Sequence, residues 1–491
     1  MMGDAEQAGL IDSVLRERFG LESLRPLQSE IVDRVLSGGD ALVVMPTGGG
    51  KSLCFQLPAL VNKQRLGGGV TLVFSPLVAL MEDQVAALRK KGIAASFVNA
   101  TVSKGERAKR YAALSRAEYD LFYATPERME REDFTEAIDA VPGGVTLLAV
   151  DECHCVTKWG HDLRPAYQRI GEFRQQLGNP TTIALTATAT KPVRADVRRV
   201  LGGDEESMPM FVAPVGRANL ELRARSVWGD DEKVQAIKRV AEEVGTTGIV
   251  YFTLIKDLHP MAEKIRRAMP GHEVLVYHGR LDAKQRRRVY RRFIDAKPND
   301  KLILCATNAF GMGVDKSDIR FIVHAQIPGS IEAYHQEVGR AGRDGNDSVC
   351  ELLYAQEDLA IQQEFVRWQN PSADLLMGTL SAIEARFADV EFDSDDLRVH
   401  VIGKGHAHGM GGGVMDYVLI RLADLGAIEP TGFQSDEGLT IYRFVGVVDD
   451  DLIEPGTLEE KHKRDLMRLL DVVNLTKSGD IAASVGAYFG F

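Results

Sequence analysis

The residues with the clearest chemical potential lie in the stretch ALVVMPTGGGKSLCFQ, which runs from Ala41 to Gln56. Its apolar beginning predicts a short buried strand, and Lys51 and Ser52 open a predicted helix after a loop of small residues. The loop residues are Thr47, Gly48, Gly49 and Gly50. Backbone N–H groups of such a loop surround a phosphate, while the lysine reaches the outer phosphates and the serine hydroxyl suits Mg²⁺. Met45 stands where this motif usually begins with glycine, and a glycine-rich turn beside a surface lysine is the alternative.

Two adjacent carboxylates, Asp151 and Glu152, follow the apolar segment VTLLAV. A carboxylate at a strand end holds Mg²⁺ through water, and a second one beside it positions and deprotonates an attacking water. We therefore predict that Asp151 binds the metal and that Glu152 acts on the water. The alternative is an acidic strand end without a catalytic role, and the phosphate loop earlier in the chain argues against it.

Cys153, His154 and Cys155 come next and have the side chains of metal ligands. Three adjacent residues cannot aim at one ion without a sharp bend, and no further cluster has ligand spacing, so we expect no zinc. We predict instead that His154 couples the nucleotide site to contacts between lobes. His406 and His408 lie in a glycine-rich loop, where solvated histidines are the expectation.

Arg340 and Arg343 end the segment SIEAYHQEVGRAGRDG, residues 330–345. Phosphoryl transfer spreads negative charge over the γ-phosphate oxygens, and an inserted arginine stabilises that charge. If the second half of the chain faces the first, these arginines reach the phosphates across a cleft. Closure would then depend on nucleotide and opening on hydrolysis, as in a two-lobed motor.

Strands and helices alternate through both halves of the chain, which predicts two doubly wound parallel sheets of the α/β class. The first set of segments that begin with a strand is 41–45, 70–76, 119–129, 145–154 and 181–190. The second set is 248–254, 273–281, 301–315 and 319–328. Ligands bind at the carboxyl ends of the strands in such folds, which is where the candidate residues occur.

Helices are predicted between these strands by apolar spacing. Residues 10–19 form one, and Pro26 begins another at a position where a missing N–H costs nothing. Arg25 and Gln28 therefore lie just upstream of the phosphate loop, where a glutamine amide can pair with both a donor and an acceptor on adenine. Further helices are expected at 77–92 and 257–268.

The acidity of the chain is concentrated in one segment. The net charge is −11 over 491 residues, yet residues 381–460 carry 17 acidic and 5 basic side chains. The rest is nearly neutral and leaves room for local basic strips that could contact nucleic acid. One strip comprises Lys284, Arg286, Arg287, Arg288, Arg291 and Arg292. For a charge run alone, a solvated helix face is the better interpretation.

The composition is typical of a soluble globular protein with roughly two to four domains. No apolar run reaches the length of a membrane span, and the acidic N-terminus lacks the apolar core of a secretory signal. Five scattered cysteines without a C-x-x-C pair fit a reducing compartment. We expect a cytoplasmic location, on the nucleoid if the source is bacterial, and no membrane partner.

The motifs PTGGGKS, SPLVALMEDQV, ATPERM, DECH, LTATAT, YHGRL, ATNAFGMGVDK and HQEVGRAGRDG stand in the order of superfamily 2 helicases. Within that group the chain resembles the RecQ family of DNA helicases. FGLESLRPLQ before the phosphate loop and HCVTKWGHDLRPAY after the carboxylates are the most specific features, because the latter matches the aromatic-rich loop of the family. The resemblance covers about residues 10–355 and implies ATP and Mg²⁺ as cofactors.

The resemblance implies a role for each matching residue. Arg25 and Gln28 would contact adenine, and Arg343 would be the arginine finger, supported by Gln336 and Arg340. The residues expected to touch the single-strand backbone are Ser75, Thr125, His278 and Thr307. Those expected in the loop that couples DNA to ATP hydrolysis are Trp159, His161, Arg164 and Tyr167. Aromatic rings in that loop offer faces for base stacking, and a core anchor is the alternative for the tryptophan.

The chain also departs from the family. Leu21 stands where many members place an aromatic residue against adenine, and Leu163 replaces a phenylalanine of the aromatic-rich loop. The usual four-cysteine zinc module is missing, although residues 461–491 resemble its helical hairpin. Residues 356–455 combine two helical segments, 374–388 and 414–425, with a strand, which predicts a winged helix placed before the hairpin.

The resemblance implies two tandem RecA-like lobes followed by a winged-helix-like segment and a helical hairpin. The expected domains are 1–210, 211–355, 356–455 and 456–491. We expect an ATP-dependent DNA helicase that moves 3′→5′ on single-stranded DNA and separates duplex or branched DNA in repair or recombination. The acidic segment is expected to contact a protein partner or the basic lobes.

Three alternatives remain open at this point. A DNA-dependent translocase or annealing factor would hydrolyse ATP without productive unwinding, as the missing zinc module suggests. An RNA helicase is a weaker alternative, because the aromatic-rich loop resembles that of the DNA enzymes. An ATP-gated scaffold is weaker still, because every hydrolytic position is filled.

Overall fold

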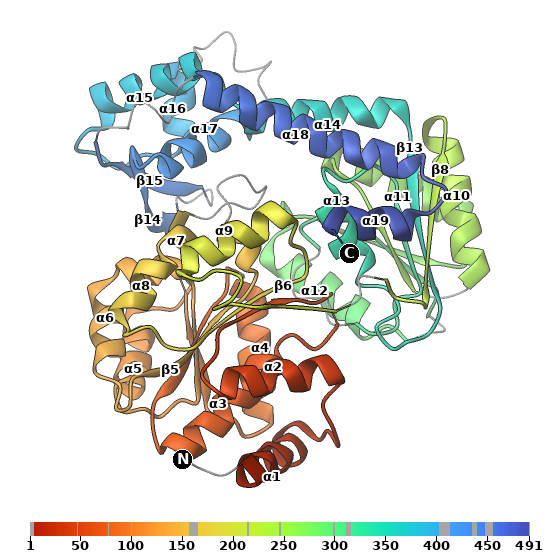
Figure 1. The fold of residues 1–491 in the computed structure, drawn as a ribbon. Helices are drawn as coiled ribbons and strands as arrows, with labels where there is room; N and C mark the ends of the chain where they lie inside the picture. Colours follow the sequence, from red (N-terminus) through yellow and green to blue (C-terminus); the bar gives the residue numbers. More distant parts are fainter. Residues whose placement is uncertain are drawn as a thin grey trace. The chain divides into compact units, whose positions relative to one another are not determined.

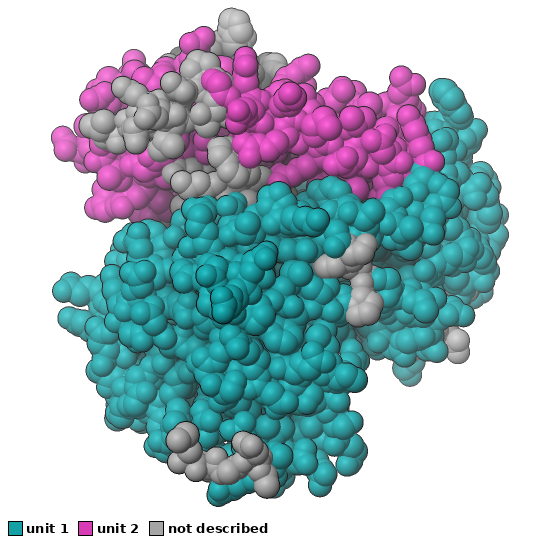
Figure 2. Space-filling view, viewed as in Figure 1, with its two compact units in different colours: residues 1–326, 332–353, 478–491 teal, residues 327–331, 354–477 magenta. Residues whose placement is uncertain are grey.

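The computed structural model of the chain divides into two compact units (Figures 1 and 2). Unit 1 comprises residues 1–326, 332–353 and 478–491, and unit 2 comprises residues 327–331 and 354–477. The structure describes residues 4–46, 48–76, 78–99, 101–156, 165–213, 216–244, 247–297, 300–310, 316–401, 413–434, 439–446 and 455–490.

Unit 1 contains two parallel-sheet lobes, which confirms the predicted fold class. The sheet of the first lobe has the strand order β3-β4-β2-β5-β6-β1-β7, with parallel neighbours throughout. Its strands are β1 (Ala41–Val44), β2 (Val70–Phe74), β3 (Ala95–Val98), β4 (Leu121–Ala124), β5 (Val145–Val150), β6 (Thr182–Thr186) and β7 (Met210–Val212). The predicted domain boundary at residue 210 therefore lies inside β7.

Three helical segments of the first lobe precede β1, and the others follow its strands in the chain. They are α1 (Asp4–Val14), η1 (Leu15–Phe19), α2 (Pro26–Leu36), α3 (Leu53–Leu66), α4 (Val78–Lys90), α5 (Lys104–Leu114), η2 (Pro126–Glu130), α6 (Glu132–Asp139), η3 (Cys153–Val156), α7 (Pro165–Gln168), α8 (Ile170–Gln176) and α9 (Lys191–Leu201). The predicted helix 10–19 is thus split, because its last five residues form a wider π-type turn that ends at Gly20, whose φ of +68° suits glycine.

The second lobe has a sheet of order β10-β11-β9-β12-β13-β8. Its strands are β8 (Leu220–Ser226), β9 (Gly248–Tyr251), β10 (Glu273–Tyr277), β11 (Leu302–Ala306), β12 (Phe321–His324) and β13 (Ser348–Tyr354). Its helices are α10 (Gly229–Val244), α11 (Ile255–Ala268), α12 (Ala283–Ile294) and α13 (Ile331–Val338). In both lobes the carboxyl ends of the central strands carry the predicted site residues.

The first sheet is buried on both faces, as a parallel sheet covered by helices requires. Alternate residues of β1 point to opposite sides, so Leu42 and Val44 join one core cluster while Ala41 and Val43 join the other. The two clusters hold the sheet rigidly between helices, which positions the loops at its carboxyl edge.

Unit 2 is mostly helical. Its elements are α14 (Gln356–Gln369), α15 (Ala373–Phe387), α16 (Ser394–Val401), α17 (Gly413–Asp424), β14 (Ile428–Gln434), β15 (Thr440–Phe444) and α18 (Pro455–Thr476). β14 and β15 pair in antiparallel fashion after the four helices α14 to α17, and Phe392 and Tyr442 pack in the shared core. This order of helices and a β-hairpin agrees with the predicted winged helix, whose identity stays a prediction.

The predicted helical hairpin at 456–491 is not one compact unit. α18 packs on α14, where the Lys461 ammonium donates to Asn370 Oδ1 at 2.9 Å. α19 (Ile481–Phe489) lies in unit 1, where it packs against β8. The division between Lys477 and Ser478 arises because each helix buries its apolar face in a different unit. Among the residues described, no helix is both long and apolar enough to cross a membrane.

Candidate functional site

The phosphate loop follows β1 and takes a shape that excludes larger residues. Gly48 and Gly50 have φ of +80° and +87°, and a Cβ atom on Gly50 would lie 2.3 Å from Nε2 of Gln28. The Lys51 ammonium donates a hydrogen bond to the Met45 carbonyl at 3.0 Å, inside the loop. The loop thus presents backbone groups and a cation to an anion, while Thr47 lies outside the described residues.

Arg25 and Gln28 are tied to this loop. The backbone N–H of Arg25 donates to Oε1 of Gln28 at 3.0 Å, and the guanidinium of Arg25 donates to the Gly49 carbonyl at 3.2 Å. Nε2 of Gln28 donates to the Gly49 and Gly50 carbonyls at 3.4 and 3.3 Å. The side chains of Arg25 and Gln28 are therefore hydrogen-bonded to the phosphate loop. Their contact with adenine stays a prediction.

Asp151 and Glu152 end β5 at the same edge of the sheet. Asp151 is 6 % exposed and accepts a hydrogen bond from the Glu152 N–H at 3.0 Å, and Glu152 adopts a φ of +48°. Burial, followed by repulsion from Glu152, raises the pKa of Asp151, whereas Lys51 opposes this shift. Oε2 of Glu152 is buried and accepts no hydrogen bond from a described residue. A buried carboxylate pair, at the sheet edge that also carries Ser52, fits a divalent cation.

Replacing Asp151 with asparagine is expected to stabilise the ligand-free protein. A folded-state pKa above the unfolded value means that folding retains a proton, so the carboxyl group destabilises the fold increasingly as pH rises. The asparagine side chain cannot ionise, and the gain in melting temperature should be larger at about pH 8.5 than at about pH 5.5. Thermal unfolding at both pH values measures this difference. A lower melting temperature of the asparagine variant at the higher pH would contradict the prediction that the ionised Asp151 carboxylate destabilises the fold.

His154 links the carboxylates to the segment LTATAT at the end of β6. Its Nδ1 lies 2.9 Å from Oγ1 of Thr186 and 3.4 Å from Oε2 of Glu152. Thr186 Oγ1 in turn donates to the Thr188 carbonyl at 2.9 Å. Polar contacts through His154 therefore connect Glu152 to the loop after β6, and the coupling role of His154 stays a prediction.

The aromatic-rich loop is described only at its end. Trp159, His161 and Arg164 lie outside the described residues, so their predicted DNA contacts stay predictions. Tyr167 is fully buried, and its hydroxyl donates to the Asp151 carbonyl at 3.0 Å. The expectation that Tyr167 offers a ring face to a base is therefore wrong in this structure, because its ring lies in the core of the first lobe. Its bond to Asp151 is compatible with coupling.

Arg343 of the second lobe reaches the phosphate loop of the first. Its Cγ and Cδ atoms lie 3.3 and 3.4 Å from the position that a Cβ atom of Gly48 would take. Arg340 is 6 % exposed and lies near the buried Tyr251 hydroxyl, inside the second lobe. Gln336 is half-buried on α13. Of the three predicted residues, Arg343 is the one that the structure places on the loop.

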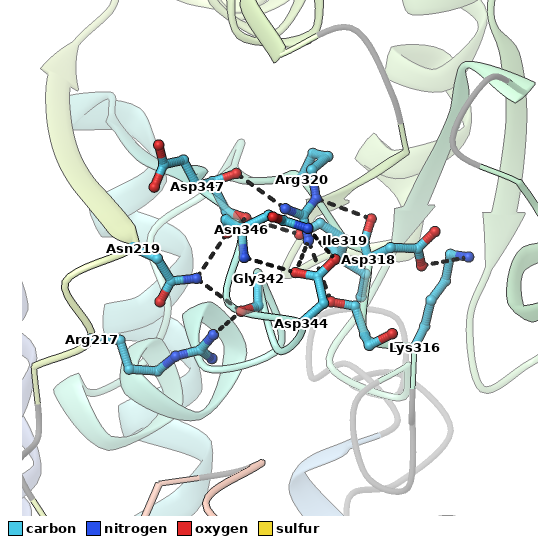
Figure 3. A network of polar contacts seen from close by, with 12 residues as sticks. Arg217, Asn219, Lys316, Asp318, Ile319, Arg320, Gly342, Asp344, Asn346 and Asp347 are labelled. Carbon is cyan, nitrogen blue, oxygen red and sulfur yellow. Dashed lines mark hydrogen bonds and ion pairs between the residues drawn. The ribbon is translucent and has the colours of Figure 1, made fainter.

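The turn that carries Arg343 is fixed on both sides (Figure 3). The side-chain amide of Asn219 and the guanidinium of Arg217 both donate to the Gly342 carbonyl. Arg320 donates to Asp344 Oδ1 at 2.6 Å on the other side. Because neighbours on each side are held, the backbone of Arg343 is presented in one position, which is what an arginine acting on phosphate requires.

His335 lies one residue before Gln336 on α13 and close to the phosphate-binding lysine. Burial, and then the charge of Lys51, lower the pKa of His335 to about 4. The imidazole is therefore neutral at physiological pH and adds no positive charge to the nucleotide site. The charge of Lys51 in the first lobe thus reaches α13 of the second lobe.

The predicted DNA contacts occur in two pairs at strand ends. Ser75 and Thr125 follow β2 and β4 and are joined through the Ser75 N–H, which donates to the Ala124 carbonyl. His278 and Thr307 follow β10 and β11. All four are less than 9 % exposed, and Nε2 of His278 lies 2.9 Å from Nε2 of His259. The structure thus brings each pair together within its lobe, at the edge where ligands bind parallel sheets.

Sequence reasoning missed the residues that hold the Arg343 turn. Arg217 and Asn219 lie in the connection before β8, more than a hundred residues upstream, and no local motif marks them. Gly342 gives one signal, because its φ of +56° and the 2.6 Å approach of Asn219 Nδ2 to a would-be Cβ leave room for glycine alone. His335 was also not predicted from the sequence to be a residue of the site.

Comparisons with known proteins agree with this geometry. Residues 25–196 match the DEAD/DEAH box helicase family, and residues 232–345 match the helicase conserved C-terminal domain. A probable ATP-dependent DNA helicase RecS of Bacillus subtilis is 36% identical over 375 residues, which cover 76% of this chain and 73% of that protein. The ATP-dependent DNA helicase RecQ of the same organism is 40% identical over 356 residues, which cover 72% of this chain and 57% of the relative.

Solved structures show the same fold at low sequence identity. The helicase MrfA bound to DNA is 18% identical, with a TM-score of 0.59 over 90% of this chain and 59% of that one. The Mycobacterium smegmatis helicase Lhr, bound to single-stranded DNA and AMP-PNP, is 19% identical, with a TM-score of 0.56 over 94% of this chain and 62% of that one.

Proposed function

The chain belongs to the RecQ family of ATP-dependent DNA helicases, and from this premise we propose that it translocates 3′→5′ on single-stranded DNA and separates duplex or branched DNA in repair or recombination. The observation that carries the proposal is the contact of Arg343 with the phosphate loop. A hydrolytic site assembled from two lobes changes composition whenever the lobes separate. ATP binding and hydrolysis can therefore drive lobe movement along a strand.

Each residue of the nucleotide site has a part in the proposed cycle. The phosphate loop and Lys51 bind the phosphates of ATP, and Arg25 and Gln28 face the adenine. Ser52 and Asp151 would hold Mg²⁺, which neutralises phosphate charge when bound. Glu152 accepts the proton of the attacking water.

Arg343, supported by Gln336 and Arg340, stabilises charge on the transferred phosphoryl group. His154 passes the change at Glu152 to the loop after β6, which lies at the edge where Ser75 and Thr125 would touch DNA. His278 and Thr307 would contact the strand from the second lobe. Movement of one lobe against the other then advances the strand.

The charges on the basic helix α12 favour the proposal that the partner is a nucleic acid. It carries six basic and no acidic residues, and Lys284, Arg287, Arg288 and Arg291 recur at helical spacing on one side. These four are exposed and form no ion pair with a described residue, whereas Arg292 pairs with Glu273 and Asp300. Like charges at i and i+4 repel one another and destabilise the helix. Contacts between this row of cations and DNA phosphates would offset that repulsion.

The double variant R287Q/R291Q should reduce the salt dependence of single-stranded DNA binding. Each lost phosphate contact makes the negative slope of log K against log[salt] shallower by about 0.7. The slope of the double variant should therefore be shallower by about 1.4 than that of the wild type. R292Q, on the same helix but ion-paired within the lobe, should leave the slope unchanged. Fluorescence anisotropy between about 50 and about 300 mM salt measures the slope for the wild type, R287Q/R291Q and R292Q. Equal slopes in these three proteins would show that α12 does not contact DNA.

The remaining assignments are proposals of the same kind. The chain would contain no structural zinc and would have a cytoplasmic, nucleoid-associated location in a bacterium. The acidic residues 381–460 would contact a protein partner. The second candidate function is a DNA translocase or annealing factor without productive unwinding.

Strand separation and ATPase assays test the proposed function together. A 3′-tailed fork should be unwound with ATP, while a 5′-tailed fork should not, and single-stranded DNA should stimulate ATPase more than RNA does. Stimulation by DNA without unwinding would identify the translocase instead. Stimulation by RNA alone, or none at all, would overturn the proposal.

A further inference from the structure

The last turn of α19 lies between elements of the two lobes of unit 1. Phe489 is 1 % exposed, its ring contacts α13 of the second lobe, and its carbonyl accepts a hydrogen bond from α9 of the first lobe. None of the helicase motifs includes this helix. Its contacts nevertheless fall on α9, which continues directly from LTATAT, and on α13, which contains the first residues of HQEVGRAGRDG.

The attachment to the second lobe is both apolar and polar. The ring of Phe489 lies 5.3 Å from the ring of His335, and the hydroxyl of Tyr488 donates to Oε1 of Glu332 at 2.8 Å. Glu332 and His335 are three residues apart and therefore share one face of α13. α19 also packs against β8, and Figure 1 shows it beside α13. These contacts together fix α19 to the second lobe.

The attachment to the first lobe passes through a buried arginine. Arg194 of α9 is 6 % exposed, and its Nη2 donates to the Phe489 carbonyl while its Nε donates to the Ala189 carbonyl at 2.9 Å. Ala189 lies within LTATAT. Lys191 approaches the next residue, Gly490, whose would-be Cβ lies 3.1 Å from Cε of the lysine. One guanidinium thus joins α19 to the loop that follows β6.

The two attachments differ in physical character. Carbonyl groups at the end of a helix lack intrahelical partners, and a cation there is favoured by the helix dipole. The bond from Arg194 to Phe489 satisfies such a carbonyl and is directional, so it breaks when the lobes move apart. The packed ring of Phe489 and the contacts along β8 bury apolar surface, so they stay with the second lobe.

We propose that α19 is a latch between the lobes, in which Phe489 and Arg194 position α13, and through it Arg343, over the phosphate loop. The proposal rests on the proposed function, because it concerns the closed state in which ATP is hydrolysed. The latch raises the fraction of molecules that are closed before nucleotide binds. Apparent affinity for ATP increases in proportion to that fraction, whereas saturating ATP closes the lobes by itself.

Two arginine replacements on α9 distinguish loss of the latch from a general loss of protein stability. R194A should raise the KM for ATP and the Kd for a non-hydrolysable ATP analogue about tenfold, the size expected for losing one hydrogen bond of a charged group. The kcat at saturating ATP should change less than about twofold, because only the closed fraction is altered. R198A is the matched control, since Arg198 is equally buried one turn later but bonds Met208 and Glu205 within the first lobe.

A second variant keeps the test sharp if R194A folds poorly. Y488F removes the hydroxyl that donates to Glu332 and leaves the ring, so it should raise the same Kd by a smaller factor. Hydrogen exchange in residues 481–489 should be faster in R194A without nucleotide and return to the wild-type rate with the analogue. An unchanged Kd in R194A, or an equal rise in R198A, would overturn the latch. Because analogue binding is measured without DNA, this result is independent of whether the protein unwinds.

Discussion

Replacement of Arg343 with alanine is expected to lower the kcat for ATP hydrolysis at least about 10³-fold, the range known for arginine fingers. The side chain lies against Gly48 of the phosphate loop, although it belongs to the other lobe. Removing it therefore leaves charge on the transferred phosphoryl group without its partner from the second lobe, and single-turnover hydrolysis measures the loss.

Two further variants separate the charge of Arg343 from its geometry. R343K keeps a cation but lacks the planar fork of donors, so it should restore only a small part of the rate. R320A removes the bond that holds Asp344 and should reduce kcat by a smaller factor, because Arg217 and Asn219 still hold Gly342. Near-normal turnover in R343A would show that the contact with Gly48 has no part in hydrolysis.

Glu152→Gln is expected to lower kcat by about 10²–10⁴-fold, as the loss of a general base does, while ATP still binds. Glutamine has nearly the same size, so the unusual φ of +48° and the hydrogen bond from the residue 152 N–H to Asp151 persist. The amide cannot accept the proton of the attacking water. Rapid-quench hydrolysis and equilibrium binding of ATP measure the two effects separately.

Asp151→Asn provides the comparison for this variant. Loss of the Asp151 carboxylate should weaken Mg²⁺-dependent nucleotide binding as well as turnover, whereas E152Q should affect turnover alone. A Mg²⁺ titration of ATP binding distinguishes the two variants. Retained turnover in E152Q would transfer the general-base role to another group.

A lobe-spanning site explains why lobe contacts matter for catalysis. In the proposed cycle Arg343 would act only when its lobe is close, because the turn around it is held on both sides and moves with that lobe (Figure 3). The polar path from Glu152 through His154 to Thr186 then reaches the same segment, LTATAT, that Arg194 joins to α19. The proposed coupling path and the proposed latch thus meet at one loop.

Much of this protein was determined by local sequence. The phosphate loop could be predicted because Gly48 and Gly50 adopt backbone angles that only small residues reach, next to a lysine at a fixed spacing. The carboxylates Asp151 and Glu152 could be predicted because they follow a strand whose apolar run marks burial on both faces. Alternating strands and helices led to parallel sheets for the same reason, since each signal depends on residues that are close in the chain.

Tertiary structure alone decided which distant groups meet. The contact between Arg343 and Gly48, the support of Gly342 by Asn219, and the burial of Tyr167 all depend on how separate elements pack. The assignment of α18 and α19 to different units likewise depends on which surface buries each apolar face, because the pattern of both helices fits a hairpin equally well. An amphipathic pattern shows that a face is buried, but the partner that covers it is chosen by the free energy of packing over the whole fold.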